Sequence, residues 1–179
     1  MNDLWVFGYA SLMWKPGFDY AEKTRARLSG YHRALCIHSW EHRGTRQRPG
    51  LVMGLDRGGS CVGLAFRILP ENKQDVMTYL RARELITKVY KERIGPITLD
   101  CGTRVNAVTY VADRAHEQYA GRMDISDAIA QVCGAVGDAG PNEDYVINTA
   151  EHIKSLGIND PWLASVSKGI KEFSRLKDV

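Results

Sequence analysis

The sequence predicts an α+β fold in which helices pack against a largely antiparallel sheet or a small β-barrel. Strand-like segments dominate the first 111 residues, with one helical pattern among them, and the chain turns helical from about residue 124. Alternating strand–helix–strand units are not evident, which disfavours a doubly wound fold. Given 179 residues of ordinary composition, we expect a single domain spanning residues 1–179.

The expected strands lie mostly in the first half of the chain. They occupy residues 4–10, 26–40, 51–55 and 61–69, followed by 89–90, 97–99 and 105–111. Pro70 ends the fourth strand, and Gly58 with Gly59 separates the third from the fourth. A glycine pair between two apolar runs predicts a β-hairpin at this point.

Helical spacing first appears after Pro70, where Val76, Met77, Leu80 and Glu84 follow one another at intervals typical of a helix. Three more helices are expected after residue 124, each with a candidate N-cap residue. The candidates are Asp124 or Ser126, then Asn142, then Asn159 or Asp160 with Pro161 next in the chain.

The composition is that of an ordinary globular protein and excludes several classes. Hydrophobic residues make up 44% and charged residues 25%, and the net charge of +3 is too small to indicate a nucleic-acid partner. There is no basic leader and no apolar run of membrane-spanning length. We therefore expect a cytoplasmic protein with no nucleic-acid and no membrane partner, and find no signal for an oligomeric state.

The cysteines and histidines do not form a recognisable metal or redox motif. Cysteines at positions 36, 61, 101 and 133 stand far apart, without a C-x-x-C pair, which predicts reduced structural thiols. His32, His38 and His42 lack a carboxylate or cysteine pattern that would complete a metal site. We therefore expect no metal and no other cofactor.

The segment "WVFGYASL" at residues 5–12 begins as an apolar strand and breaks early into small and polar residues. Gly8, Ala10 and Ser11 have little side chain, so a ligand can approach the main-chain N–H groups, which are able to bind an anion or an oxyanion. The alternative is an ordinary turn at the end of a strand. Ser11 is disfavoured as a nucleophile because the segment is not G-x-S-x-G.

Glu84 ends the helix predicted after Pro70, at the point where the chain returns to strand. A carboxylate leaving a helix beside a sheet can be partly buried, and burial raises its pKa towards the range of a general base. The alternative is a surface ion pair with Lys88 or Arg81, which lie four residues after it and three before it.

Two later segments are further candidates for binding sites. Residues 41–48 carry Arg43, Arg46 and Arg48, which can hold a carboxylate or a phosphate, or can form a solvated basic loop. The glycines at 134–140 follow a predicted helix and lack the lysine of a phosphate loop, so a helix end and loop are expected. Tyr145 lies one turn into the next helix, where it either faces a pocket or packs.

The order of these segments resembles that of the ChaC family of γ-glutamylcyclotransferases, in its glutathione-specific branch. The resemblance spans nearly the whole chain and rests on "WVFGYASLMWKPGF" at 5–18, "HRG" at 42–44, "RPG" at 48–50, "YLRAREL" at 79–85 with Tyr90, and "GPNEDYV" at 140–146. It implies a small mixed or antiparallel β-barrel with flanking helices, the γ-glutamylcyclotransferase-like fold. It also implies a lyase-type enzyme of glutathione catabolism that converts this small molecule to 5-oxoproline and Cys-Gly.

The resemblance also assigns roles to residues. The loop of Gly8, Tyr9, Ala10, Ser11 and Leu12 would cradle the γ-glutamyl group, and Glu84 would be the general acid/base. Ala10 stands where the family usually has glycine, so a negative φ is required there.

Tyr90 and Tyr145 correspond less closely to family positions, and both are expected to contact the substrate. The charge of Arg43 leads us to expect that it meets the glycine carboxylate of glutathione, with Arg46 or Arg48 as further candidates.

Three other functions stay open at this point. One is a cyclotransferase for other γ-glutamyl amines or amino acids, and another is a non-catalytic module that binds small metabolites on the same fold. The third is an RNA-binding protein that uses residues 43–48, which the modest net charge disfavours.

Overall fold

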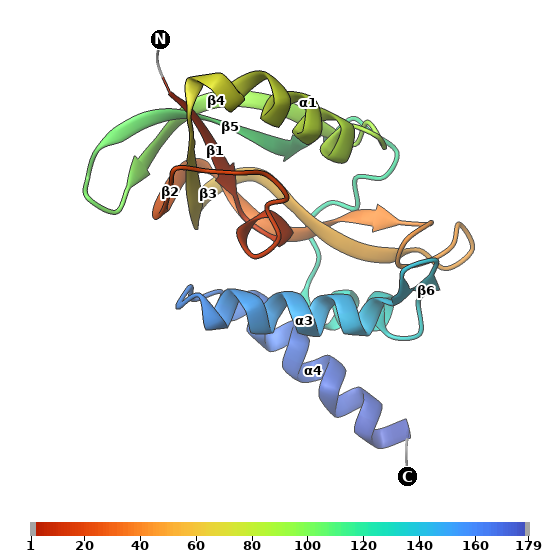
Figure 1. Cartoon of the computed structure of the whole chain (residues 1–179). Coiled ribbons are helices and arrows are strands. Elements are labelled where there is room, and N and C mark those ends of the chain that lie inside the picture. Colours follow the sequence, from red (N-terminus) through yellow and green to blue (C-terminus); the bar gives the residue numbers. More distant parts are fainter. Residues whose placement is uncertain (1–2, 178–179) are drawn as a thin grey trace. The chain divides into compact units, whose positions relative to one another are not determined.

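The computed structural model describes residues 3–177, which form two compact units (Figure 1). The first unit comprises residues 3–33 and Leu55–His116, and the second comprises Ala34–Gly54 and residues 117–177. The single domain expected from the sequence stays a prediction.

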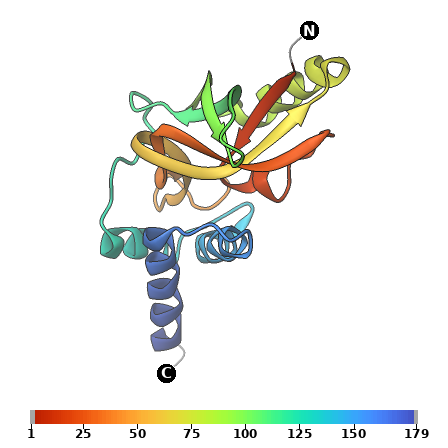
Figure 2. The same cartoon turned by 90° about the vertical axis from the view of Figure 1, so that its left-hand side faces the viewer.

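A closed five-stranded barrel contains β1 (Leu4–Gly8), β2 (Glu22–Ser39), β3 (Gly50–Ile68), β4 (Tyr90–Leu99) and β5 (Arg104–Ala112). Its strand order is β1-β3-β2-β4-β5, and Figure 2 gives a second view of these strands. β1 pairs antiparallel with β3 and parallel with β5. The predicted α+β fold with a small mixed barrel is therefore confirmed.

The β-hairpin predicted at Gly58 and Gly59 is wrong, because β3 continues through both glycines. Their φ angles of 101° and 66° are left-handed, yet the strand stays extended on either side. The neighbouring strand β2 runs past this point, since the His32 ring lies 2.9 Å from the Gly58 carbonyl oxygen. Local sequence does not distinguish a turn from an irregularity inside a strand, whereas pairing with a long neighbour does.

The helix predicted after Pro70 is confirmed as α1 (Lys73–Glu84), preceded by the short 3-10 turn η2 (Pro70–Asn72). Val76, Met77 and Leu80 form its buried face. Arg81 donates two hydrogen bonds, of 2.8 and 2.9 Å, to the Glu92 carboxylate of β4. This bidentate pair ties the last turns of α1 to the barrel wall.

The core of the first unit consists of apolar side chains from the strands and α1. Its most deeply buried members include Val6, Phe7, Leu28, Leu55, Phe66, Ile68, Leu80, Val108 and Tyr110. A polar contact crosses it where the Thr109 hydroxyl of β5 donates to the Phe7 carbonyl of β1, at 3.1 Å. Burial on this scale removes most of the apolar strand surface from water and stabilises the barrel.

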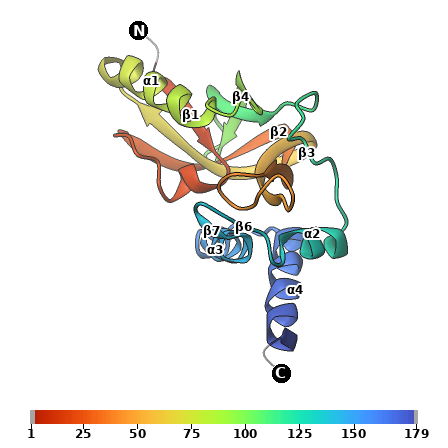
Figure 3. The same ribbon diagram turned by 90° about the vertical axis from the view of Figure 1, so that its right-hand side faces the viewer.

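The second unit contains three helices, α2 (Ile125–Val132), α3 (Asn142–Ser155) and α4 (Pro161–Lys177), and the short strands β6 (Val136–Gly137) and β7 (Gly140–Pro141). α4 packs against both α2 and α3 (Figure 3). The Asp160 carboxylate accepts the Leu163 N–H at 3.1 Å, so the predicted cap of α4 is confirmed. Within residues 3–177, no helix combines the length and apolarity needed to cross a bilayer.

The helix-cap role predicted for Asn142 is wrong, because Pro141 occupies the N-cap position and Asn142 is the first residue of α3. The Asn142 side chain is fully buried, and its amide bonds both backbone groups of Leu51. The two distances are 2.7 Å to the Leu51 N–H and 2.9 Å to the Leu51 carbonyl. A buried amide needs such partners, and the strand backbone supplies them.

The cysteines divide into two environments. Cys36, Cys61 and Cys133 are buried and not joined in disulfides, and Cys101 is exposed at the turn between β4 and β5. The three buried thiols lie among apolar side chains, as expected of structural cysteines.

We predict that Asn142→Ala lowers the free energy of unfolding, because it leaves the Leu51 N–H and carbonyl without their partner. Each backbone group left unpaired in the interior costs about 1–3 kcal/mol. Urea unfolding would measure the loss, with Asn148→Ala on the exposed part of the same helix as the control. Equal stability of the two variants would contradict the prediction.

Candidate active site

The candidate site begins where β1 ends at Gly8 and the chain turns into the 3-10 helix η1 (Ser11–Met13). Met13 and Trp14 donate the first backbone bonds of this turn, to the carbonyls of Ala10 and Ser11 at 2.8 and 3.3 Å. The N–H groups before Met13 are therefore not used by the turn itself. Ala10 has φ −138°, so the negative φ required at this position is confirmed.

The backbone of β3 passes directly against the start of this loop. A Cβ atom added at Gly63 would lie 2.2 Å from the Gly8 carbonyl oxygen and 2.8 Å from the Phe7 ring. Only glycine leaves room for this close approach. The contact fixes the point at which the loop leaves the barrel.

Arg33 of β2 holds the next residue of the loop. Its Nε donates to the Tyr9 carbonyl at 2.6 Å, and its Nη2 donates to the Val62 carbonyl at 2.7 Å. In a planar trans peptide the N–H points away from the carbonyl, so this contact directs the Ala10 N–H to the opposite side. Sequence reasoning missed Arg33, because β2 carries several charged residues and nothing local distinguishes this one.

Glu84 is the last residue of α1, and its side chain is only 17% exposed. Burial raises the pKa of its carboxyl, while the Arg83 guanidinium, 3.2 Å from Oε1, partly opposes that rise. The surface pair with Arg81 is absent, because Arg81 bonds Glu92 instead. The predicted partial burial of Glu84 is therefore confirmed, and its role as an acid/base stays a prediction.

Arg83 brings the loop and Glu84 into one site. Its Nη2 donates to the Ser11 hydroxyl at 3.0 Å, and its Nη1 donates to the Lys15 carbonyl at 2.8 Å. The same guanidinium touches both the loop and the Glu84 carboxylate, so the two predicted parts of the site are neighbours. The sequence places Arg83 directly before Glu84 and gives no sign of this contact with Ser11.

A second polar group lies near Glu84 on the barrel wall. The Tyr110 hydroxyl of β5 donates to the Glu92 carboxylate at 3.2 Å. Burial, assisted by the negative charges of Glu92 and Glu84, raises the pKa of Tyr110 and keeps its phenol protonated. Arg81 lowers the pKa of Glu92, so that carboxylate stays ionised and accepts the bond. Glu84 is therefore the carboxyl of this group whose environment favours taking up a proton.

The other predicted substrate contacts lie elsewhere in the chain. Tyr90 begins β4 in the first unit, half-buried and opposite Ala112. Arg43 and Tyr145 belong to the second unit, where the guanidinium lies 5.5 Å from the ring centroid. The Tyr145 hydroxyl also accepts the Met53 N–H at 3.0 Å. Roles for these three residues in binding substrate stay predictions.

The remaining arginines of the basic loop have partners within the second unit. The Arg46 guanidinium lies 4.5 Å from the centroid of the Trp40 ring, and Arg48 donates to the Cys133 carbonyl. These contacts favour a structural role for both side chains.

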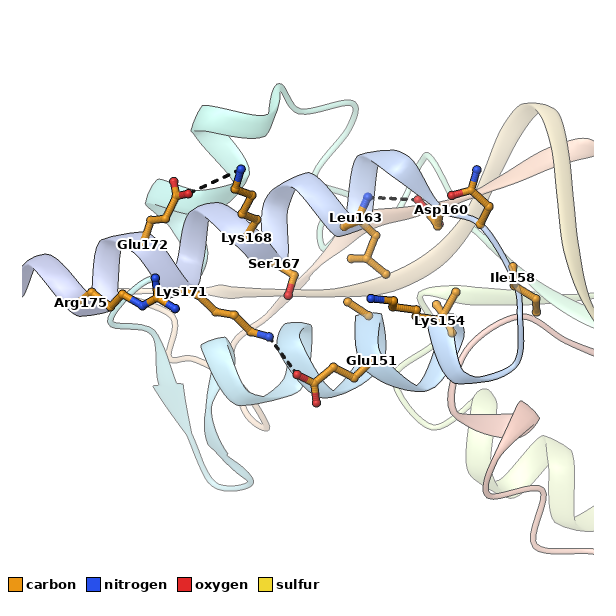
Figure 4. Close-up of a pocket in the computed structure, with 14 residues that line it drawn as sticks. Glu151, Lys154, Ile158, Asp160, Leu163, Ser167, Lys168, Lys171, Glu172 and Arg175 are labelled. Carbon is orange, nitrogen blue, oxygen red and sulfur yellow. Dashed lines mark hydrogen bonds and ion pairs between the residues drawn. The ribbon is translucent and has the colours of Figure 1, made fainter.

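A cavity of about 580 Å³ lies between α3 and α4 in the second unit (Figure 4). Four of its charged side chains form two ion pairs, Lys171 with Glu151 at 2.9 Å and Lys168 with Glu172 at 3.9 Å. The residues predicted for the site, all of them described, do not line it. Paired surface charges around an open groove carry no evident chemistry, so Glu84 and the 8–12 loop remain the candidate active site.

Among residues 3–177, no cluster of three or more His, Cys, Asp or Glu side chains is placed to hold a metal ion. In the candidate site the carboxylate of Glu84 has a cationic neighbour, Arg83, which suits proton transfer better than cation binding.

Comparison with known protein families identifies one match across the chain. Residues 4–173 match the family described as ChaC-like protein. The glutathione-specific gamma-glutamylcyclotransferase of Escherichia coli is 32% identical over 94% of this chain and 73% of its own length. Gamma-glutamylcyclotransferase 2-3 of Arabidopsis thaliana is also 32% identical, over 94% of this chain and 88% of its own.

The fold recurs in a solved structure. The crystal structure of a γ-glutamyl cyclotransferase specific to glutathione from yeast superposes with a TM-score of 0.83. The alignment covers 97% of both chains at 20% identity, so it establishes the shared fold.

We predict that Glu84→Gln stabilises the protein increasingly as the pH rises. Because the carboxyl pKa is raised in the folded state, the native protein binds the proton more tightly than the unfolded chain. Stability contributed by the protonated form is therefore lost as the pH rises from the ordinary pKa of glutamic acid to the raised one.

Thermal or urea unfolding of both proteins across this pH range would measure the difference. Glu71→Gln, at an exposed glutamate ahead of the same helix, is the control. A stability difference between wild type and Glu84→Gln that does not change with pH would count against the prediction.

Proposed function

Because the chain belongs to the ChaC-like protein family, we propose that it is a γ-glutamylcyclotransferase that cleaves glutathione to 5-oxoproline and Cys-Gly. The observation that carries this proposal is the position of Glu84, a glutamic acid with only 17% of its side chain exposed, joined through Arg83 to the loop at Ser11. Burial raises the pKa of its carboxyl. A pocket for a purely anionic ligand gains nothing from this carboxylate, which argues against a non-catalytic module that binds anions.

The reaction requires little from the enzyme beyond folding the substrate and moving protons. In a γ-glutamyl compound the α-amine can reach its own γ-carbonyl carbon and close a five-membered lactam. One C–N bond forms and the amide bond to Cys-Gly breaks, with no change of oxidation state. Since both reacting groups belong to one molecule, their proximity is built into the substrate.

Glu84 supplies the proton transfers. The α-amine arrives as an ammonium group, and the Glu84 carboxylate takes a proton from it so that the free amine attacks. The protonated carboxyl then gives this proton to the nitrogen of the departing Cys-Gly. The ring nitrogen loses its second proton as the lactam forms, and the released amine of Cys-Gly takes up a proton in its place. A raised pKa brings the carboxyl closer to the working pH, which serves both steps, and such a group contributes about 10²–10⁴-fold.

The loop of Gly8–Leu12 holds the γ-glutamyl end. Its small residues let the substrate approach the backbone, and the N–H groups ahead of η1 face either the α-carboxylate or the oxyanion formed on attack. Arg33 supports this by bonding the Tyr9 carbonyl from the opposite side of the peptide.

Arg43 meets the glycine carboxylate of glutathione in this proposal. Its ring contact with Tyr145 and its bond of 3.2 Å to the Pro141 carbonyl hold the guanidinium in one orientation. Arg46 and Arg48 have the structural contacts described above, which also disfavours RNA binding by this loop.

We predict that the purified protein forms 5-oxoproline from glutathione and that Glu84→Gln lowers kcat by about 10²–10⁴-fold. Mass spectrometry would follow the product, with Glu71→Gln expected to retain wild-type activity. Wild-type kcat/KM is expected to fall as the pH drops through the raised pKa of Glu84, because the base must be ionised.

Each other result has a definite meaning. Absence of 5-oxoproline from the wild-type reaction would refute the proposed activity. Full activity of Glu84→Gln would show that Glu84 is not the acid/base. Product from γ-glutamyl-alanine and not from glutathione would keep the chemistry and change the substrate.

We predict that Arg43→Met lowers kcat/KM for glutathione by about 10–100-fold, the worth of a charge-assisted hydrogen bond of about 1.5–3 kcal/mol. The matched substrate is glutathione with its glycine carboxylate amidated, on which the substitution should have little effect. Equal losses on both substrates would show that Arg43 does not bind that carboxylate.

A further inference from the structure

Arg83 uses all three nitrogens of its guanidinium. Nη1 shares its two hydrogens among three acceptors, the carbonyls of Lys15 and Pro16 at 2.8 and 3.2 Å and the Tyr79 hydroxyl at 3.1 Å. Nη2 donates to the Ser11 hydroxyl at 3.0 Å, and Nε lies 3.2 Å from Glu84 Oε1. One side chain therefore contacts both ends of the segment from Ser11 to Pro16 and the carboxylate proposed as the base.

The same segment meets α1 at a second point. Gly17 has φ +77°, and a Cβ atom there would lie only 2.0 Å from the Tyr79 hydroxyl. The Phe18 and Tyr79 rings are in edge contact, with centroids 6.2 Å apart. The chain after η1 is thus pressed against the helix face that carries Tyr79 and Arg83, one turn apart.

We propose that Arg83 is a positioning residue for the cyclotransferase reaction, whose guanidinium holds the Ser11–Pro16 segment at a set distance from the Glu84 carboxylate. The inference rests on the function proposed above. The planar guanidinium donates to several acceptors in fixed directions at once. A lysine ammonium at this position would keep the positive charge but could not make the same set of hydrogen bonds. A displacement of about 1 Å between reacting groups can cost about 10²-fold in rate, so this bridge is of direct consequence for turnover.

Arg83 also acts on the protonation of Glu84. Its positive charge opposes the rise in the Glu84 pKa caused by burial. The other titratable groups near Glu84 are Tyr110 of β5 and, bonded to it, Glu92 of β4 with its partner Arg81. Arg83→Gln, which removes the charge, should therefore shift the acidic side of the pH profile of kcat/KM to higher pH. Arg83→Lys, which keeps the charge, should shift it less.

The experiment compares Arg83→Lys and Arg83→Gln with the wild type on glutathione. We expect both variants to lower kcat by about 10²-fold with a smaller change in KM. The acidic side of the pH profile should shift mainly in Arg83→Gln. The control is Arg67→Gln, which removes an arginine bonded to Asp3 and Glu22 on the barrel surface and should leave activity unchanged.

A double-mutant cycle with Ser11→Ala tests the bridge itself. If Arg83 acts through Ser11, the double variant Arg83→Lys with Ser11→Ala should lose little more than Arg83→Lys alone. Additive losses, or wild-type kcat in Arg83→Lys, would overturn the proposal.

Hydrogen exchange gives a readout that does not depend on turnover. The amides of Met13, Trp14 and Lys15 are bonded within η1, and we expect them to exchange faster in Arg83→Lys than in wild type. Unchanged exchange would refute the positioning role even if the wild type proved inactive on glutathione. Inactivity of the wild type, with faster exchange in the variant, would instead refute the proposed function and leave the bridge in place.

Discussion

The parallel pairing of β1 with β5 is the constraint on which the rest of the first unit depends. Trp5 lies opposite Ala107 and Val6 opposite Val108, while the other edge of β1 pairs with β3 along its whole length. A five-residue strand held on both sides cannot slide or rotate, since a slip of one residue would turn its apolar side chains outward. The loop after Gly8 therefore leaves the barrel at a fixed point, where Gly63 allows the backbone of β3 to lie against it.

The fold holds the Glu84 carboxyl in an environment where its charged form is less stable than in water. Burial of its carboxyl disfavours the charged form, and the only ion pair in contact with it among the described residues is with its neighbour Arg83. Helix α1 is nevertheless held in place by the buried Val76, Met77 and Leu80 and by the Arg81–Glu92 pair. Packing of the rest of the helix offsets the cost at its last residue, which is a common arrangement at functional sites.

Much of the fold was predictable because strands and helices differ in the period of their apolar residues. The α+β class, α1 and the Asp160 cap of α4 followed from local patterns. The glycines of β3 and the role of Asn142 did not, because each depends on a partner distant in sequence. β2 keeps β3 extended through Gly58, and the Leu51 backbone takes both amide groups of Asn142.

The sequence by itself determined the residue types of the candidate site, namely a loop of small residues after an apolar strand and a glutamate at a helix end. Both features depend only on residues a few positions apart, so they can be recognised from the sequence. Only the tertiary structure decided that most of the Glu84 side chain is shielded from solvent and that Arg83 bridges it to Ser11, 72 residues earlier in the chain. Burial and hydrogen-bond partners belong to pairs of segments, and barrel closure is what brings these segments within reach of one guanidinium.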